Sequence, residues 1–381
     1  MTVTVEVLNS LGGIDATAWD DCAGPENPFL SHAFLLAMEE SGTACAETGW
    51  MPAHLIARQH DQVSGVAPVY LKTHSYGEYV FDYSWAHAYQ QLGGSYYPKL
   101  QVAVPYTPVP GPRLLGKTPA ATAALAEGLR AVAERMGVSG AHVTYCQRHD
   151  WEVLQRAGFL TRLDQQYHWH NQGYRDFDDF LSTLSSRKRK AIKKERERAR
   201  SHGLTIEVLT GNDLTEAHWD ALFEFYLDTG NRKWGRPYLN REFFARLGQS
   251  MAQQVVLIMA RQGPRWVAGA WNLLGSKALF GRNWGCVEHF DCLHFELCYY
   301  QAIEQAIMRG LERVEAGAQG QHKLQRGYLP VPTYSAHYLA DATFRGLIER
   351  YLREEKAEVR ATIAILGQRH SPYKNEVEQP G

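Results

Sequence analysis

The stretch MRGLERVEAGAQGQHKLQRGYL, residues 308–329, reads as the end of a helix, a short strand, a polar turn, a second short helix and a Gly-aromatic pair. The stretch ERMGVSGAHVTYCQRHDWEVLQRAGFL, residues 134–160, follows the same order, and both contain Leu-Gln-Arg before the glycine. A repeat this long is typical of a duplicated domain rather than of a solenoid.

The two halves also begin alike. Alternating apolar residues predict strands over 3–8 and 204–209, and helical patterns follow near 28–41 and 214–229. Further strands are expected over 53–60, 64–72, 254–261 and 265–273, with a hairpin turn at Gln262-Gly263-Pro264, and long helices over 119–136 and 294–309. This order predicts an α/β fold, with helices on the faces of a mixed sheet, in two domains, 1–165 and 166–381.

Composition narrows the class of protein. The chain has 381 residues, and 45% of them are hydrophobic, which suits a globular protein with a sizeable core. It has no run of about 18 apolar residues, so no membrane span is expected. The N-terminus lacks the pattern of a signal peptide, and the six cysteines show no paired spacing. We therefore expect a cytoplasmic protein with free thiols and no metal site.

The charge is unevenly distributed. The net charge is −1, but residues 186–200, SRKRKAIKKERERAR, hold nine Lys or Arg and two Glu, which leaves 31 basic and 39 acidic residues elsewhere. The run fits an ordinary solvated helix. It equally fits a surface for phosphates on a nucleotide, a lipid head group or RNA.

Several blocks of sequence resemble a known family. They are Asn27-Pro28-Phe29 with Ser31, the basic segment 184–199, KWGRPYL at 233–239, FGRNWG at 280–285, HFELCYY at 294–300, and the stretch 315–337. Together with the element order, they resemble the FemAB-like N-acyltransferases, which carry two tandem GNAT-like domains. The resemblance implies transfer of an activated acyl or aminoacyl group to an amine, in a peptidoglycan precursor or a small amine metabolite.

The resemblance implies no tightly bound cofactor and leaves two donors open as co-substrates. Arg282-Asn283-Trp284-Gly285 resembles only the first half of the acetyl-CoA signature R/QxxGxG/A. This departure favours aminoacyl-tRNA as donor, with tRNA as a partner. The basic segment 184–202 is too short for the two-helix arm common among tRNA-using relatives, so acyl-CoA stays open. The alternative reading is a non-catalytic protein that binds a peptide or a glycan and is built on the same duplicated GNAT-like fold.

N-acylation needs a base for the amine, help for the oxyanion and a proton donor for the leaving group. A helix expected to begin near Leu293 offers Glu296 or His294 as the base and Tyr299 or Tyr300 as the donor, close to a partly positive N-terminus. In an α-helix both tyrosines share the face of Glu296. The structural alternatives are a buried Glu296–Arg pair and a His294 that makes one hydrogen bond at the helix start.

The polar turn after residue 315 is the second cluster. Its glycines allow backbone to approach a ligand, and His322 is a further candidate base. Lys323 and Arg326 suit a carboxylate or phosphate. The other expected substrate-binding residues are Gln319 in this turn, Ser335 and His337 on the next strand, Arg282, Asn283 and Trp284 before the helix, and Lys233 and Trp234 in a basic aromatic loop.

Overall fold

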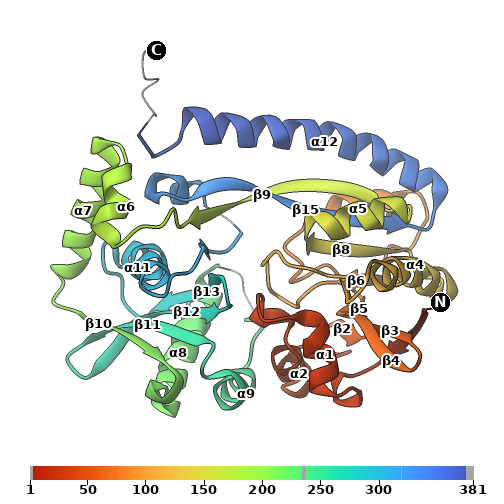
Figure 1. Cartoon of the computed structure of the whole chain (residues 1–381), viewed down its shortest axis with the longest axis horizontal. Helices are drawn as coiled ribbons and strands as arrows, with labels where there is room; N and C mark the ends of the chain where they lie inside the picture. Colours follow the sequence, from red (N-terminus) through yellow and green to blue (C-terminus); the bar gives the residue numbers. More distant parts are fainter. Residues whose placement is uncertain (1–2, 234–236, 319, 375–381) are drawn as a thin grey trace. The chain divides into compact units, whose positions relative to one another are not determined.

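The computed structural model describes residues 3–233, 237–318 and 320–374, without the side chains of 229 and 231–233. The chain forms two compact units (Figure 1). The first comprises Met1–Asp164, Tyr238–Ser250 and Pro332–Arg360, and the second comprises Gln165–Pro237, Met251–Val331 and Ala361–Gly381. The chain thus passes into the second unit close to the expected boundary at 165, but two later segments belong to the first unit.

The first unit contains two groups of strands. An antiparallel sheet has the order β1 (Thr4–Leu8), β3 (His54–Gln59), β4 (Gln62–Ala67) and β7 (Leu115–Gly116). The second group has the order β15 (Leu329–Leu339), β8 (Gly140–Cys146), β6 (Lys99–Val102), β5 (Val69–Lys72) and β2 (Trp50–Pro52). The single strand expected over 64–72 is divided at Pro68, which has no N–H to donate to a ladder.

The helices of this unit are α1 (Ala16–Ala23), α2 (His32–Glu40), α3 (Tyr83–Gln91), α4 (Pro119–Met136), α5 (Arg148–Arg156), α9 (Arg241–Met251) and the first part of α12 (Ala342–Arg369), with 3-10 turns at Leu11–Gly13 and Pro28–Leu30. Helix α4 has the predicted bounds because Thr118 caps its start, Pro119 opens it, and Gly137 ends it in the left-handed conformation. Its apolar face packs with Leu100 and Val143 in the core.

The second unit has the strand order β10 (Thr205–Thr210), β11 (Val255–Gln262), β12 (Arg265–Leu274), β13 (Ala278–Cys286), β14 (Arg313–Glu315) and β9 (Leu160–His170). Its helices are α6 (Phe177–Thr183), α7 (Ser186–Arg200), α8 (Glu216–Lys233), α10 (Leu293–Phe295) and α11 (Gln301–Met308), with a π-helical segment Glu296–Tyr300 and 3-10 turns at Gly211–Asp213 and Gln321–Arg326. The predicted hairpin is confirmed, since β11 ends at Gln262 and β12 begins at Arg265.

The internal repeat is present in the fold, with its last strands exchanged. Strand β8 and helix α5 in the first copy correspond to β14 and the turn Gln321–Arg326 in the second. Strand β9 follows the first copy along the chain but pairs antiparallel with β14. Strand β15 follows the second copy and pairs antiparallel with β8. Each half therefore supplies the strand that completes the other half's repeat.

In each unit, two central strands pair in parallel over only a short stretch. Strand β6 pairs with β8 from Leu100 to Val102, and β13 pairs with β14 from Ala278 to Phe280. Beyond Phe280, the rest of β13 continues only alongside β12 among the described strands. The ladder between β13 and β14 therefore stops at Phe280 and Glu315, and we call this point, where the pairing of the two strands ends, the opening of the second unit.

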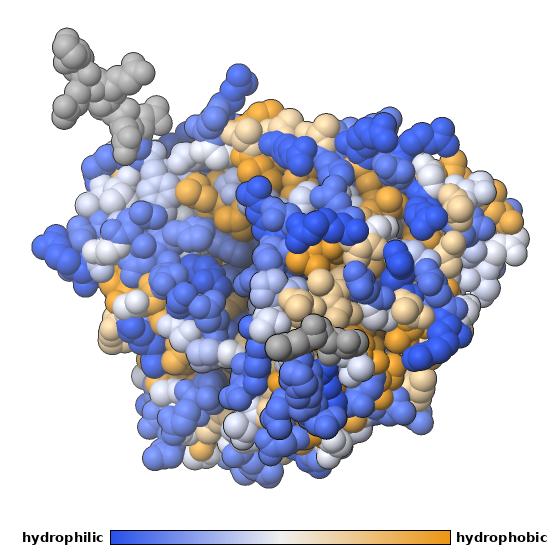
Figure 2. Space-filling model, turned by 45° about the vertical axis from the view of Figure 1, so that its right-hand side comes forward, coloured by the Kyte–Doolittle hydropathy of each residue, from blue (hydrophilic) through white to orange (hydrophobic). Residues whose placement is uncertain are grey.

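The surface mixes polar and apolar residues. On the face shown in Figure 2, hydrophobic residues emerge as patches among hydrophilic ones. Among the residues with described side chains, ten large hydrophobic ones are exposed, and three of these lie within the eight residues 76–83. No helix in the described part of the chain combines the length and apolarity needed to cross a bilayer.

Candidate functional site

The edge of the opening in the second unit is formed by a β-bulge. Gly281 lies opposite Asn272 and Asn283 lies opposite Trp271, so Arg282 is the extra residue in β13. A bulge bends a strand and redirects its side chains. Arg282 Nε and Asn283 Oδ1 are both buried without a hydrogen-bond partner among the described residues. Arg282 and Asn283, expected to bind substrate, thus bring unsatisfied polar atoms to this edge.

The helix next to the opening is not a regular α-helix. It begins at Leu293, as expected, but Glu296–Tyr300 is π-helical before α11 continues. A π-turn contains more residues than an α-turn, and such turns are frequent at functional sites. Glu296 and Tyr300 both contact helix α7, as residues on one face would, so the expectation of a face shared with Glu296 fails for Tyr299 alone. Tyr299 contacts His322, whereas Tyr300 donates its hydroxyl proton to Glu195.

Glu296 is fully buried and engaged by helix α7. Its two oxygens accept from Arg196 Nε and Nη2 at 3.0 and 2.8 Å, and Gln301 donates to it at 2.8 Å. Arg196 also donates to Glu304 at 2.7 Å. A carboxylate held by two donors from one guanidinium and by an amide is the geometry of a structural ion pair. This is the structural alternative that the sequence left open for Glu296.

Tyr299 and His322 form the pair best placed for proton transfer. The Tyr299 hydroxyl lies 2.8 Å from His322 Nε2. Burial raises the pKa of Tyr299, so this residue keeps its proton. Burial, with Arg326 and Lys323 nearby, lowers the pKa of His322, which keeps the imidazole neutral. The ring of His294 lies 5.4 Å from Tyr299 and 5.2 Å from Trp284, centroid to centroid.

Lys323 lies beside the opening. Its ammonium nitrogen is 2.6 Å from the carbonyl oxygen of Gly317, two residues beyond the end of β14. The side chain is 1% exposed, and burial lowers its pKa to about 7. Gly320 has φ 115°, and a Cβ there would come within 2.6 Å of the His322 ring. The glycine-rich turn thus brings a lysine and a histidine together where a side chain at 320 would collide.

Arg326 and Tyr300 are held by a partner that the sequence did not reveal. Glu195 accepts from Arg326 Nη2 at 2.8 Å and from Nε at 3.1 Å, and it also accepts from Tyr300. The guanidinium lies 3.5 Å from the centre of the Phe295 ring. Arg326, expected to bind substrate, and Tyr300, expected as a proton donor or substrate contact, therefore hold helix α7 against the site. The only signal was a glutamate placed inside a basic run.

The remaining expected residues fall elsewhere. Ser335 and His337 belong to the first unit, where Ser335 Oγ accepts from the backbone of Tyr145 at 3.3 Å and His337 Nδ1 lies 2.8 Å from His142 Nδ1. The side chain of Lys233, and all of Trp234 and Gln319, lie outside the described residues.

A family model for peptidoglycan biosynthesis/recognition, FemAB-like, matches residues 10–375 of the chain. The chain belongs to the FemAB-like family. This membership makes it a transferase of the acyl and aminoacyl class expected from the sequence, in peptidoglycan-related chemistry.

Solved structures agree on the fold. FemX is 11% identical with a TM-score of 0.57, covering 92% of this chain and all of that one. L-PGS from Bacillus licheniformis is 10% identical with a TM-score of 0.52, covering 91% and 99%. A conserved protein of unknown function from Bacteroides thetaiotaomicron VPI-5482 is 11% identical with a TM-score of 0.52, covering 89% and 100%. The α/β class with tandem GNAT-like domains is thereby confirmed. No curated protein matches the sequence.

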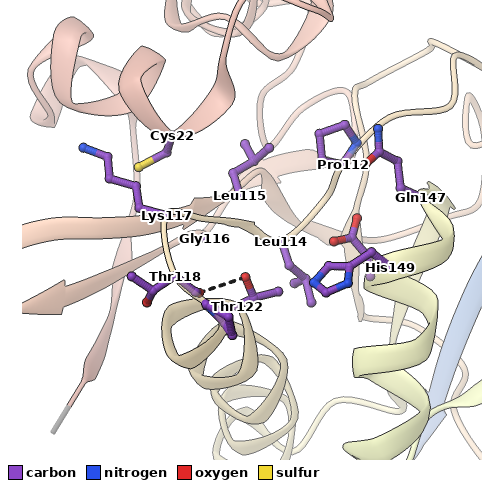
Figure 3. A pocket seen from close by; sticks show the side chains of 12 residues that line it. Cys22, Pro112, Leu114, Leu115, Gly116, Lys117, Thr118, Thr122, Gln147 and His149 are labelled. Carbon is purple, nitrogen blue, oxygen red and sulfur yellow. Dashed lines mark hydrogen bonds between the residues drawn. The ribbon is translucent and has the colours of Figure 1, made fainter. Parts of the chain in front are cut away.

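The FemAB-like chain also has a pocket of about 270 Å³ in its first unit, near the starts of α4 and α5 (Figure 3). Cys22, Lys117 and Thr118 lie on one side and Gln147 and His149 on the other. The two buried polar groups of its wall are already bonded. Thr122 Oγ1 donates to the Thr118 carbonyl at 3.2 Å, and Asp150 accepts from the Arg113 backbone at 2.7 Å. The opening beside β13, with its unsatisfied polar atoms, is therefore the stronger candidate for chemistry.

Helix α7 of the FemAB-like chain contains the basic run, and the partners of its side chains show how much of the positive charge is balanced. Arg196 is buried in ion pairs, while Lys193 and Arg198 make looser pairs with Asp178 and Asp291 at 3.6 and 3.7 Å. The other six basic side chains form no ion pair with any described residue: Arg187, Lys188, Arg189, Lys190, Lys194 and Arg200. The helix also has no acidic residue in its first turn, where negative charge is favourable. A surplus of positive charge thus remains on its surface.

Proposed function

We propose that the second unit transfers an aminoacyl group directly from aminoacyl-tRNA to an amine of a peptidoglycan precursor. The observation that carries the proposal is the Tyr299–His322 pair, 2.8 Å apart, with buried Lys323 next to it at the opening between β13 and β14. A GNAT-like fold holds its donor at such an opening, and the family membership supplies the class of reaction.

The pair has the properties that the chemistry requires. The acceptor arrives as a neutral amine and attacks the donor carbonyl, forming the C–N bond. His322 takes one amine proton through the Tyr299 hydroxyl, and the pair then returns one proton to the leaving oxygen as the C–O bond breaks. Proton uptake and release balance, and no covalent enzyme intermediate is needed. Positioned acid-base groups of this kind contribute about 10²–10⁴-fold to rate.

Lys323 stabilises the oxyanion in this proposal. The negative charge that develops on the carbonyl oxygen needs a donor in a water-poor setting. The ammonium of Lys323 is buried, and among the described residues it uses one of its three protons, for the Gly317 carbonyl. Glu296 and Arg196, in contrast, hold helix α7 in place and do not touch the reacting atoms.

The choice of donor rests on helix α7. Its six cations that pair with no acidic residue in the described part of the chain fit a long polyanion better than a single nucleotide. The incomplete acetyl-CoA signature points the same way. Both features support aminoacyl-tRNA over acyl-CoA.

The test uses the whole chain with a nucleotide-linked muramyl peptide as acceptor. We expect labelled aminoacyl-tRNA, and not acyl-CoA, to give an amide product by mass spectrometry. Tyr299→Phe and His322→Asn should each lower kcat by about 10²-fold or more, while Tyr351→Phe on α12 serves as an unrelated tyrosine control. Acceptor binding without turnover on any donor would favour the non-catalytic reading instead.

A second experiment isolates the donor. Replacing Lys190 and Lys194 with Glu should weaken tRNA binding and lower the salt dependence of the binding constant. Each lost phosphate contact removes about 0.7 to 0.9 from the slope of log K against log salt. Arg350→Glu, an exposed cation on α12, is the matched control. Equal effects from both variants would contradict a specific role for α7.

A further inference from the structure

The segment 73–98 of the first unit has an unusual composition. It holds eight aromatic residues and no Lys or Arg among its 26 residues, whereas the whole chain is 12% aromatic. The segment connects β5 to β6 and includes helix α3. Neither the family comparison nor the acyl-transfer site accounts for this composition.

Three of these rings are exposed and adjacent. Tyr76 is 58% exposed, Phe81 56% and Tyr83 44%. The ring of Tyr83 lies 6.2 Å from that of Tyr76 and stacks at 6.3 Å on that of Phe81, centroid to centroid. Contiguous exposed aromatic rings are uncommon on a protein surface and typically mark a binding site. We call these three residues the aromatic surface.

Three basic side chains, of which Lys72 and Lys99 are fully buried, bond to the segment that carries the aromatic surface. Lys99, which is fully buried, donates to Ser75, Glu78 and Asp82 at 2.9, 2.8 and 2.5 Å. Lys72 donates to the carbonyl of Tyr76 at 3.2 Å, and Arg162 donates to that of Phe81 at 3.0 Å. The rings are therefore presented by a fixed backbone, at a low cost in ordering on binding.

The backbone around the surface is strained. Tyr79, Tyr106 and Tyr145 have φ values of 59°, 54° and 54°, a region that bulky residues rarely adopt. They form one locality, because Tyr145 donates to the Tyr79 carbonyl at 2.9 Å and Gly77 packs directly against the Tyr106 ring. Such outliers cluster at ligand-binding sites, where the surrounding structure maintains them.

We propose that the aromatic surface binds an amino-sugar ring by stacking against the apolar face of that ring. A hexose ring has a face of C–H groups and a polar edge, which matches exposed rings with tyrosine hydroxyls at their rim. The identification of the sugar rests on the proposed function, since a peptidoglycan precursor carries amino sugars.

The test measures binding alone, so that it does not depend on turnover. Saturation-transfer NMR and calorimetry would be run on the full chain with N-acetylglucosamine and with muramyl dipeptide. We expect saturable binding that weakens by about tenfold when Tyr76 and Tyr83 are both changed to Ala, since each aromatic contact contributes modestly. Tyr83→Phe should retain the stacking and most of the affinity.

Tyr351→Ala, a tyrosine of similar exposure on α12, should leave the affinity unchanged. Thermal unfolding of each variant checks that the fold survives. Saccharide binding that ignores the Tyr76 and Tyr83 changes, or saturation by uridine monophosphate alone, would overturn the inference. If the protein transfers to a muramyl peptide but the Tyr76 and Tyr83 changes leave sugar binding unaltered, this inference is contradicted and the proposed function stands. Sugar binding at the aromatic surface without transfer from any donor would support this inference and contradict the proposed function.

Discussion

Glu296 shows at the scale of one residue how a catalytic side chain and a structural one differ. Sequence spacing placed it near two tyrosines and a helix start, which fits a general base. In the structure its charge is balanced by Arg196 and its oxygens are occupied. A base must reach its substrate's proton, and this carboxylate is committed elsewhere.

Replacing Glu296 with Gln should therefore reduce stability first. The change leaves Arg196 buried with only Glu304 to balance it, and breaking a buried ion pair costs about 3 kcal/mol. Denaturant unfolding would measure the loss. Glu304→Gln is the matched control, since Glu304 is 32% exposed and should cost less than about 1 kcal/mol. A large fall in kcat with unchanged stability would restore Glu296 as a base.

Lys323 predicts a dependence of activity on pH. Its pKa is lowered from 10.5 to about 7, so its positive charge is complete well below pH 7 and is lost as pH rises through that value. If the charge stabilises the oxyanion, kcat should decline above about pH 7. Lys323→Arg should keep its charge and move this decline to higher pH. A wild-type profile still rising at pH 9 would contradict the assigned role.

At the scale of the element, the turn at Gly320 fixes the position of His322. Ala at this position requires a positive φ and places Cβ 2.6 Å from the histidine ring. We expect Gly320→Ala to lower kcat by about tenfold or more, at a stability cost of about 1–3 kcal/mol. Gly346→Ala on α12 is the control, since nothing lies within 4 Å of its Cβ. Similar kinetics for both variants would show that the turn does not position His322.

The elements also show what sequence patterns convey. Local signals were sufficient for α4, whose cap, proline and terminal glycine define its bounds, and for the hairpin β11–β12. The π-helical segment carries no such signal, so the relative directions of Tyr299 and Tyr300 were mispredicted. Glu195 was missed because its partners lie more than 100 residues away along the chain. Contacts between residues so far apart in the sequence leave no local sequence pattern.

At the scale of the whole molecule, the sequence revealed the duplication but not which strands pair with each other. Leu-Gln-Arg and the following glycine identified both copies, but nothing in either copy states which strand completes it. The exchange of β9 and β15 moved Pro332–Arg360 into the first unit, where the sequence placed a single boundary at 165.

The exchange predicts that residues 1–164 do not fold alone. This fragment keeps β8, whose residues are all buried, but lacks its partner β15. We expect the fragment to aggregate or to lack dispersed NMR signals, because an apolar strand edge would be uncovered. Co-expression with residues 165–381 should restore a folded complex. A stable, monomeric 1–164 fragment would show that β15 is dispensable.

The exchanged strands also bear on ancestry. A tandem pair of self-sufficient domains can lose either copy by a single deletion, and lineages with one domain can arise again from it. Here each copy finishes the other, so removing one leaves the survivor incomplete. Once the exchange was established, descent to a single domain required a new last strand as well as a deletion. The two halves can therefore diverge in role, but neither can be lost without removing a strand that the other half needs.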